Sequence, residues 1–117
     1  MRILVTGSRD WHSQDTIRMA LEEVRRGHHR PVLLHGDCPT GADAMADQIW
    51  REWGLPVQTF PADWKKHGRA AGPIRNQEMV NTGPDVCLAF PKGASRGTRG
   101  CIRMARKAGI EVRTWEG

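Results

Sequence analysis

The sequence has few cysteines and no long apolar run, and each shortage excludes a class of protein. Cys38, Cys87 and Cys101 are an odd number of cysteines without Cys-x-x-Cys spacing, which argues against a disulfide framework and against a zinc knuckle. No apolar run is long enough to form a transmembrane helix, so no membrane contact is expected. The five histidines show no metal-ligand spacing, so the sequence predicts no metal site.

The first residues of the chain and its unpaired cysteines indicate the cellular compartment of the protein. The apolar start of the chain is interrupted by Gly7, which is too soon for a signal peptide, so residues 3–6 are interpreted as a buried strand. Cys87 lies in an apolar run and is expected in the core. Unpaired thiols favour a reducing compartment, and the expected location is the cytoplasm.

Length and charge suggest one domain with an anionic partner. A chain of 117 residues predicts a single domain spanning 1–117. The formal net charge is +5, and residues 65–107 carry ten Lys or Arg against two acids. This asymmetry favours an anionic partner on the C-terminal half, while a solvated arginine-rich surface is the alternative explanation.

Hydrophobic periodicity predicts strands that alternate with helices. Strands are expected at 3–6, 32–34, 57–60, 86–90 and 111–115, and helices at 13–26, 41–53, 73–83 and 98–108. A polar stretch at 63–72 has no predicted element. Nearly continuous apolar strands between helices are typical of a parallel sheet covered on both faces. The predicted fold class is therefore α/β, a doubly wound and mainly parallel five-stranded sheet.

Ligands of such sheets bind beyond the carboxyl ends of the strands, so the residues that follow each strand are candidate ligand-binding residues. After the first strand, Gly7 would let a ligand approach the backbone, and Ser8 could donate to a phosphate oxygen. Arg9 offers a guanidinium fork, and Trp11 offers a flat face for a base. The alternative for Trp11 is a position in the core against the first helix.

The loop after the second strand also contains candidate ligand-binding residues, from His35 and Gly36 to Gly41, Ala42 and Asp43. Gly41 and Ala42 would leave the amides of a helix start bare for an anion. An acid at Asp43 could simply complement the helix dipole. It could instead bind ribose hydroxyls or polarise a water molecule.

A third group of candidates comprises Asp63, Trp64, Gly72, Arg75 and Asn76. Arg75 and Asn76 are predicted in the first turn of the third helix, where a cation opposes the helix dipole. A bound phosphate or carboxylate would offset that unfavourable charge. The alternative is a structural salt bridge between Arg75 and Asp63.

The last group comprises Pro91, Gly93, Ser95, Gly97 and Thr98. Gly97 and Thr98 are predicted to open a helix and to form an anion-binding nest, with the Thr98 hydroxyl as cap or phosphate ligand. The sequence has no Walker motif and no Gly-x-Gly-x-x-Gly fingerprint after its first strand.

The four groups, in this order, resemble the YspA-type, cpYpsA-related branch of the SLOG superfamily, which is named for the Smf/DprA and Lonely-Guy proteins. The resemblance is carried by Gly-Ser-Arg-x-Trp at 7–11, Gly-Ala-Asp at 41–43, Gly-Pro-x-Arg-Asn-x-x-Met at 72–79 and Gly-Thr at 97–98. It implies a Rossmann-like domain of a type found in prokaryotic and phage genomes. Such a domain would bind a nucleotide or nucleotide-derived small molecule, as a ligand sensor, and would require no cofactor.

The resemblance leaves two alternative functions open. Lonely-Guy enzymes cleave the N-glycosidic bond of nucleoside monophosphates, but Cys101 stands where their catalytic glutamate is expected. Asp43 and Arg75 are the candidate catalytic residues for such a reaction here. The other alternative is single-stranded nucleic acid binding with stacking on Trp11 or Trp64. Five tryptophans in a small chain also make a homodimer a candidate arrangement.

Overall fold

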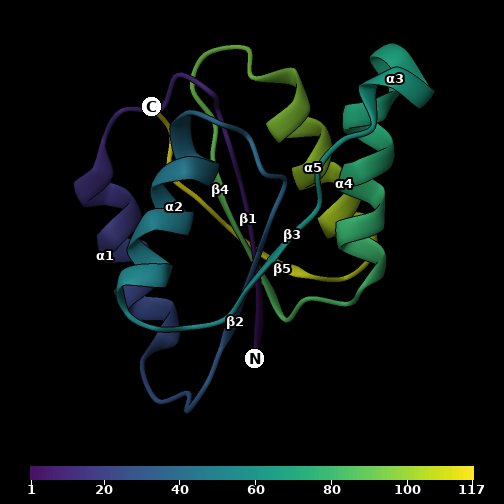
Figure 1. Ribbon diagram of the computed structural model, residues 1–117. Coiled ribbons are helices and arrows are strands. Elements are labelled where there is room, and N and C mark those ends of the chain that lie inside the picture. Colours follow the sequence, from purple (N-terminus) through teal and green to yellow (C-terminus); the bar gives the residue numbers. More distant parts are fainter.

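The computed structural model describes all residues, 1–117, and contains one five-stranded sheet in the order β3-β2-β1-β4-β5 (Figure 1). Every neighbouring pair of strands is parallel. The strands are β1 (Arg2–Gly7), β2 (Val32–His35), β3 (Val57–Thr59), β4 (Val86–Phe90) and β5 (Glu111–Thr114). The helices are α1 (Gln14–Arg25), α2 (Gly41–Glu52), α3 (Trp64–His67), the 3-10 helix η1 (Gly68–Ala70), α4 (Ala71–Asn81) and α5 (Arg96–Lys107).

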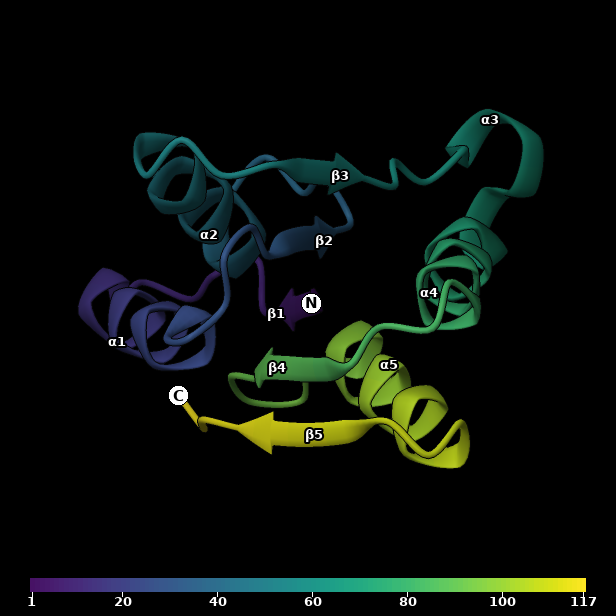
Figure 2. The ribbon, with the colours of Figure 1, turned by 90° about the horizontal axis from the view of Figure 1, so that it is seen from below.

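Helices cover both faces of the sheet, which confirms the predicted doubly wound, Rossmann-like α/β fold. Figure 2 shows α1 and α2 on one face and α4 and α5 on the other. The helices that flank the sheet bury apolar residues against it: Ile17, Leu21 and Val24 of α1 are buried at the spacing of one helical face. All five residues of β4 are buried, as expected for a strand with helices on both sides.

The strand order reverses between β1 and β4. From β1 the chain moves outward to β2 and β3, then crosses to β4 and β5 on the other side. The last residues of the two central strands, Gly7 and Phe90, pair in register. A crevice at a switch in strand order is where ligands bind in open α/β sheets, so this end of β1 and β4 is the expected site.

Two helices begin two residues earlier than predicted, and one segment without a predicted element is helical. The stretch 63–72 is helical rather than irregular, because the Asp63 carboxylate accepts a hydrogen bond from the Lys66 amide at 3.1 Å and caps α3. The next helix, α4, begins at Ala71 instead of Pro73, which moves Arg75 into its second turn. The last helix, α5, begins at Arg96 instead of Thr98. No helix combines the length and apolar character needed to span a bilayer.

Candidate functional site

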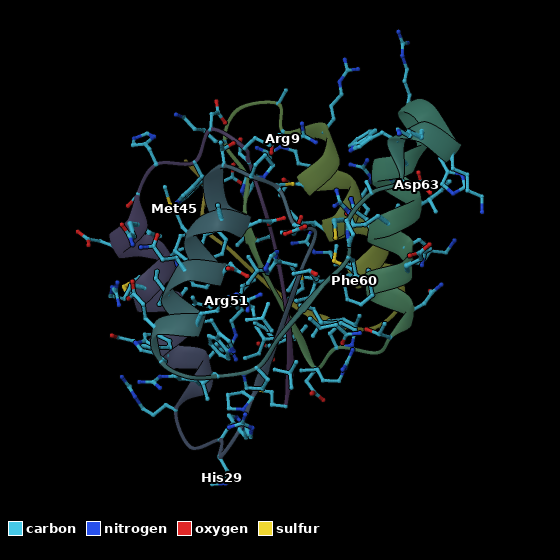
Figure 3. The ribbon with its side chains drawn as sticks, in the orientation of Figure 1. Arg9, His29, Met45, Arg51, Phe60 and Asp63 are labelled. Carbon is cyan, nitrogen blue, oxygen red and sulfur yellow. The ribbon has the colours of Figure 1, made fainter.

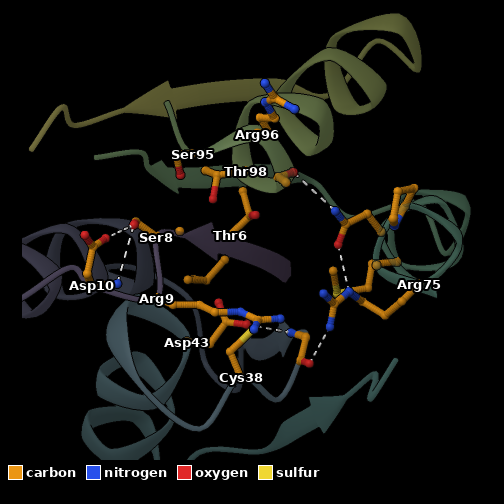
Figure 4. Close-up of a pocket in the computed structure, with 18 of the residues that line it drawn as sticks. Thr6, Ser8, Arg9, Asp10, Cys38, Asp43, Arg75, Ser95, Arg96 and Thr98 are labelled. Carbon is orange, nitrogen blue, oxygen red and sulfur yellow. Dashed lines mark hydrogen bonds between the residues drawn. The ribbon is translucent and has the colours of Figure 1, made fainter. Parts of the chain in front are cut away.

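A cavity of about 520 Å³ lies at the carboxyl ends of the central strands (Figure 4). Its walls come from the end of β1 and the loop after it, the β2–α2 loop, the starts of α2, α3 and α5, and one side of α4. The predicted site residues that line it are Gly7, Ser8, Arg9, Gly36, Asp43, Trp64, Gly72, Arg75, Asn76, Ser95, Gly97 and Thr98. The predicted site residues that do not line it are Trp11, His35, Gly41, Ala42, Asp63, Pro91 and Gly93.

Trp11 is a core residue and does not offer its ring to the cavity. Its side chain is buried, and the ring meets Phe90 edge to face with centroids 5.4 Å apart. The indole Nε1–H donates to the Ser13 carbonyl oxygen at 3.0 Å, so the polar edge is also satisfied. Of the two interpretations of Trp11, the position in the core is correct, since burying a large aromatic is strongly favourable.

The start of α2 is closed by protein, contrary to the prediction that it would accept an anion. The Ala42 amide donates to the Ser8 carbonyl oxygen at 3.2 Å. A Cβ at Gly41 would lie 2.2 Å from that same oxygen, and a Cβ at Gly7 would lie 2.3 Å from the Ala42 Cβ. Gly7 and Gly41 therefore serve the close contact between the β1–α1 loop and α2.

The start of α5 is open and turns its free amides toward the cavity. The first hydrogen bond of the helix runs from the Arg99 amide to the Ser95 carbonyl oxygen at 2.9 Å. The amides of Arg96, Gly97 and Thr98 have no acceptor in the protein. Thr98 lies in the first turn and is not the cap; that position belongs to Ser95, whose φ is 42°. Three free N–H groups and the positive end of the helix dipole suit an anion.

Arg75 forms one wall of the cavity and is held almost entirely by neutral oxygens. Its Nη1 donates to the carbonyl oxygens of Gly36 and Phe60, and its Nε donates to Asn76 Oδ1 at 2.8 Å. The salt bridge to Asp63, which was the alternative interpretation of Arg75, is absent, and Arg75 forms no ion pair. Its Nη2 has no hydrogen-bond partner, so a buried cation keeps an unused donor at the cavity.

Asp43 places a carboxyl group opposite Arg75 in the cavity wall. Its Oδ2 accepts a hydrogen bond from the Gly36 amide at 3.1 Å, while Oδ1 is buried with no partner. Because the residue is only 4% exposed, burial raises the pKa of the carboxyl group above its ordinary range.

Four polar residues of the cavity, Thr6, Asp10, Cys38 and Arg96, were not predicted as site residues. Thr6 ends the buried run of β1, where a hydroxyl among apolar neighbours was the available signal. Cys38 is half-buried beside Asp43, and burial together with that carboxylate raises the pKa of its thiol. Cys101 is a residue of α5 that is buried in the core, outside the cavity, and burial raises the pKa of its thiol to about 11.

The mouth of the cavity is framed by a cation and an aromatic ring. The Arg9 guanidinium lies 5.8 Å from the centroid of the Trp64 ring, which is 51% exposed. Gly72 of α4 lies beside that ring, and a Cβ there would make an ordinary van der Waals contact with it at 3.6 Å. The Ser8 hydroxyl is bonded to the Asp10 carboxylate and is thus occupied within the protein.

His35 is a structural residue beneath the site. Its Nδ1 accepts from the Asp37 amide at 3.0 Å, and its Nε2 pairs with Asp47 Oδ1 at 2.8 Å. A ring that accepts at Nδ1 is neutral and carries its proton on Nε2. No group of three or more His, Cys, Asp or Glu side chains is arranged to hold a metal ion.

Comparison with known proteins identifies the family. Residues 1–67 match the family model of the YspA, cpYpsA-related SLOG family. The chain belongs to this family. This SLOG protein is also 48% identical to the "Gene 61 protein" of Mycobacterium phage D29 over 119 residues, which cover 95% of this chain and 93% of the phage protein. No solved structure matches.

Proposed function

We propose that this SLOG protein binds a nucleotide or a nucleotide-derived small molecule in the cavity at the ends of β1 and β4. The observation that carries the proposal is the unused hydrogen-bonding capacity around one cavity: the free amides of α5, Arg75 Nη2 and Asp43 Oδ1. A buried polar group without a partner costs about 1–3 kcal/mol, and Asp43 Oδ1 is such a group. A ligand that offers both an anion and a hydroxyl would satisfy that oxygen and would also accept from the free donors of α5 and Arg75.

The proposed orientation follows the character of each wall. The phosphoryl group would lie on the amides of Gly97 and Thr98, where the helix dipole favours negative charge. A sugar hydroxyl would donate to Asp43 Oδ1 within reach of Arg75. The base would extend toward Arg9 and Trp64, where a ring and a guanidinium can stack on it.

Isothermal titration calorimetry tests the proposal with a panel of AMP, ADP-ribose, NAD and cyclic nucleotides. We expect at least one to bind, and Asp43→Asn to weaken it about tenfold, since the acceptor is replaced by an amide donor. Asp15→Asn is the matched control, because Asp15 is exposed on α1 and does not line the cavity. Absence of heat from every ligand would contradict the proposal.

A second candidate function is cleavage of the N-glycosidic bond of a nucleoside monophosphate. The specific observation in its favour is the position of the buried Asp43 carboxyl group in the cavity wall, where burial raises its pKa in the direction that suits a general acid. Arg75 would hold the phosphoryl group, while Cys101 is too deeply buried to take part. Chromatography of free base would detect turnover, which Asp43→Asn should abolish; no release from any monophosphate would exclude it.

We further infer a reducing location, the cytoplasm, for this protein. The thiols of Cys38, Cys87 and Cys101 are all unpaired, and the last two are buried in the core. Free buried thiols persist where glutathione and thioredoxin keep them reduced. Fractionation of the producing cells, followed by thiol labelling after unfolding, should recover three free thiols per chain in the cytoplasmic fraction.

A further inference from the structure

The segment 63–70 rises beside the mouth of the cavity without contributing to the core. We call this segment, which comprises the Asp63 cap, α3 and η1, the mouth segment. Figure 1 shows α3 at the end of the molecule where the strands finish, and Figure 3 places Asp63 and Arg9 at that same end, opposite His29. None of residues 64–70 is buried. The packing of the core therefore does not account for the composition of this segment.

The mouth segment carries positive charge that the protein does not compensate. Lys65, Lys66 and Arg69 are exposed, and none of them takes part in an ion pair. The only acid of the segment, Asp63, is engaged in capping α3. Arg9 and Arg96 line the adjacent cavity and are equally free of ion pairs. A cluster of one sign at the entrance of a cleft attracts an oppositely charged ligand.

Trp64 connects the mouth segment to the cavity. Its ring lines the cavity wall while its neighbours Lys65 and Lys66 stand in solvent. An exposed aromatic ring beside free cations is the combination that binds a base and the phosphate attached to it. A ligand whose base stacked on Trp64 would thus extend from the cavity toward Lys65 and Lys66.

We propose that the mouth segment is a second anion subsite, so that the ligand is a nucleotide with a second phosphoryl group lying outside the cavity. This inference rests on the proposed function, which places the first phosphoryl group on α5. The group that this subsite would recognise is a nucleoside with two separated phosphoryl groups. It could be supplied by a small bisphosphate or by the end of a single-stranded oligonucleotide.

Calorimetry with matched ligands tests this subsite. The probes are the four common nucleoside 5′-monophosphates, the corresponding 3′,5′-bisphosphates and a pentanucleotide with a 5′-phosphate. We expect the best bisphosphate to bind about fivefold or more tightly than its monophosphate, since two exposed charge contacts give roughly this factor. A pentanucleotide that binds still more tightly, with a steeper salt dependence, identifies the oligonucleotide as the source; no further gain identifies the small bisphosphate.

The decisive variant replaces both lysines, Lys65→Ala with Lys66→Ala. It should remove the preference for the bisphosphate and leave the monophosphate affinity unchanged. The cap of α3 is retained because Asp63 accepts from the backbone amide of Lys66. The matched control is Arg106→Ala with Lys107→Ala, two exposed cations at the far end of α5. Circular dichroism of both variants checks that they fold.

The outcomes separate this inference from the proposed function. Equal affinity for monophosphate and bisphosphate would overturn the second subsite and leave the cavity as a nucleotide site. An equal loss of preference in the control variant would also overturn it, because the effect would then be one of net charge. Failure of every nucleotide to bind would overturn the proposed function itself.

Discussion

Gly36 is the residue on which the position of Arg75 depends. A Cβ at Gly36 would lie 2.3 Å from Arg75 Nη1, and the guanidinium cannot yield without releasing Gly36 and Phe60. We expect Gly36→Ala to destabilise the protein by about 1–3 kcal/mol and to abolish ligand binding. Urea unfolding measures the first effect and calorimetry the second.

Gly100→Ala is the control for this prediction because it makes the same chemical change elsewhere. Gly100 lies inside α5, and a Cβ there meets its nearest neighbour at 3.7 Å. Alanine should raise the stability by about 0.5–1 kcal/mol, as it does within helices in general. If Gly36→Ala behaved like Gly100→Ala, the close approach of Arg75 would not be the reason for the glycine.

The buried carboxyl group of Asp43 makes the stability of the folded protein decrease as the pH rises. Burial raises the pKa of its carboxyl group in the folded state, so the folded state holds this proton more tightly than the unfolded chain does. Stability should therefore fall as the pH rises above about 4, the ordinary value for aspartate, and level off beyond the raised pKa. In Asp43→Asn this pH-dependent part of the stability should be absent.

Thermal unfolding at a series of pH values measures the contribution of Asp43. The difference in melting temperature, variant minus wild type, should increase from acid to neutral pH. A variant that gains relative stability while losing ligand affinity would mark Asp43 as a residue kept for binding. A difference that shrinks with rising pH would mean that the carboxylate stabilises the fold.

At the scale of elements, Asn76 joins α4 to the first turn of α5. Its Oδ1 accepts from Arg75 Nε, and its Nδ2 donates to the Gly97 carbonyl oxygen at 3.3 Å. We expect Asn76→Ala to cost about 1–3 kcal/mol, because it leaves a buried donor of Arg75 without an acceptor. Gln77→Ala, which removes an exposed hydrogen bond to Asn81, should change stability by less than about 0.5 kcal/mol.

The starts of α2 and α5 show how far sequence alone could predict the site. Both follow a glycine-containing loop after a strand, and both were predicted to bind an anion. At α2 the Ser8 carbonyl of another loop accepts from the Ala42 amide and closes the start of the helix, whereas the first three amides of α5 have no acceptor. Local sequence predicts the loop and the helix, but a tertiary neighbour decides whether the helix start is open. Trp11 was ambiguous for the same reason, since its partner Phe90 is distant in sequence.

At the scale of the whole molecule, the class of the sheet could be predicted from sequence, but the order of its strands could not. Apolar strands separated by helices favour a parallel sheet covered on both faces, whereas more than one strand order satisfies right-handed crossovers. The structure places the switch between β1 and β4. That switch brings Gly36, Arg75 and Thr98 to one cavity although they come from three different segments. The mouth segment was not predicted, because its short helices depend on one cap instead of on apolar periodicity.

The same architecture predicts an uneven resistance to local opening, with β1 and β4 at one extreme and the mouth segment at the other. The two central strands are hydrogen-bonded on both sides and lie beneath helices, whereas none of residues 64–70 is buried. Native-state hydrogen exchange should therefore find amides of β1 and β4 that exchange only through global unfolding, and amides of 64–70 that exchange with little protection. Adding the tightest-binding nucleotide should slow exchange in α5 and, where it carries a second phosphoryl group, in 64–70. Protection of 64–70 equal to that of β4 in the free protein would contradict this ranking.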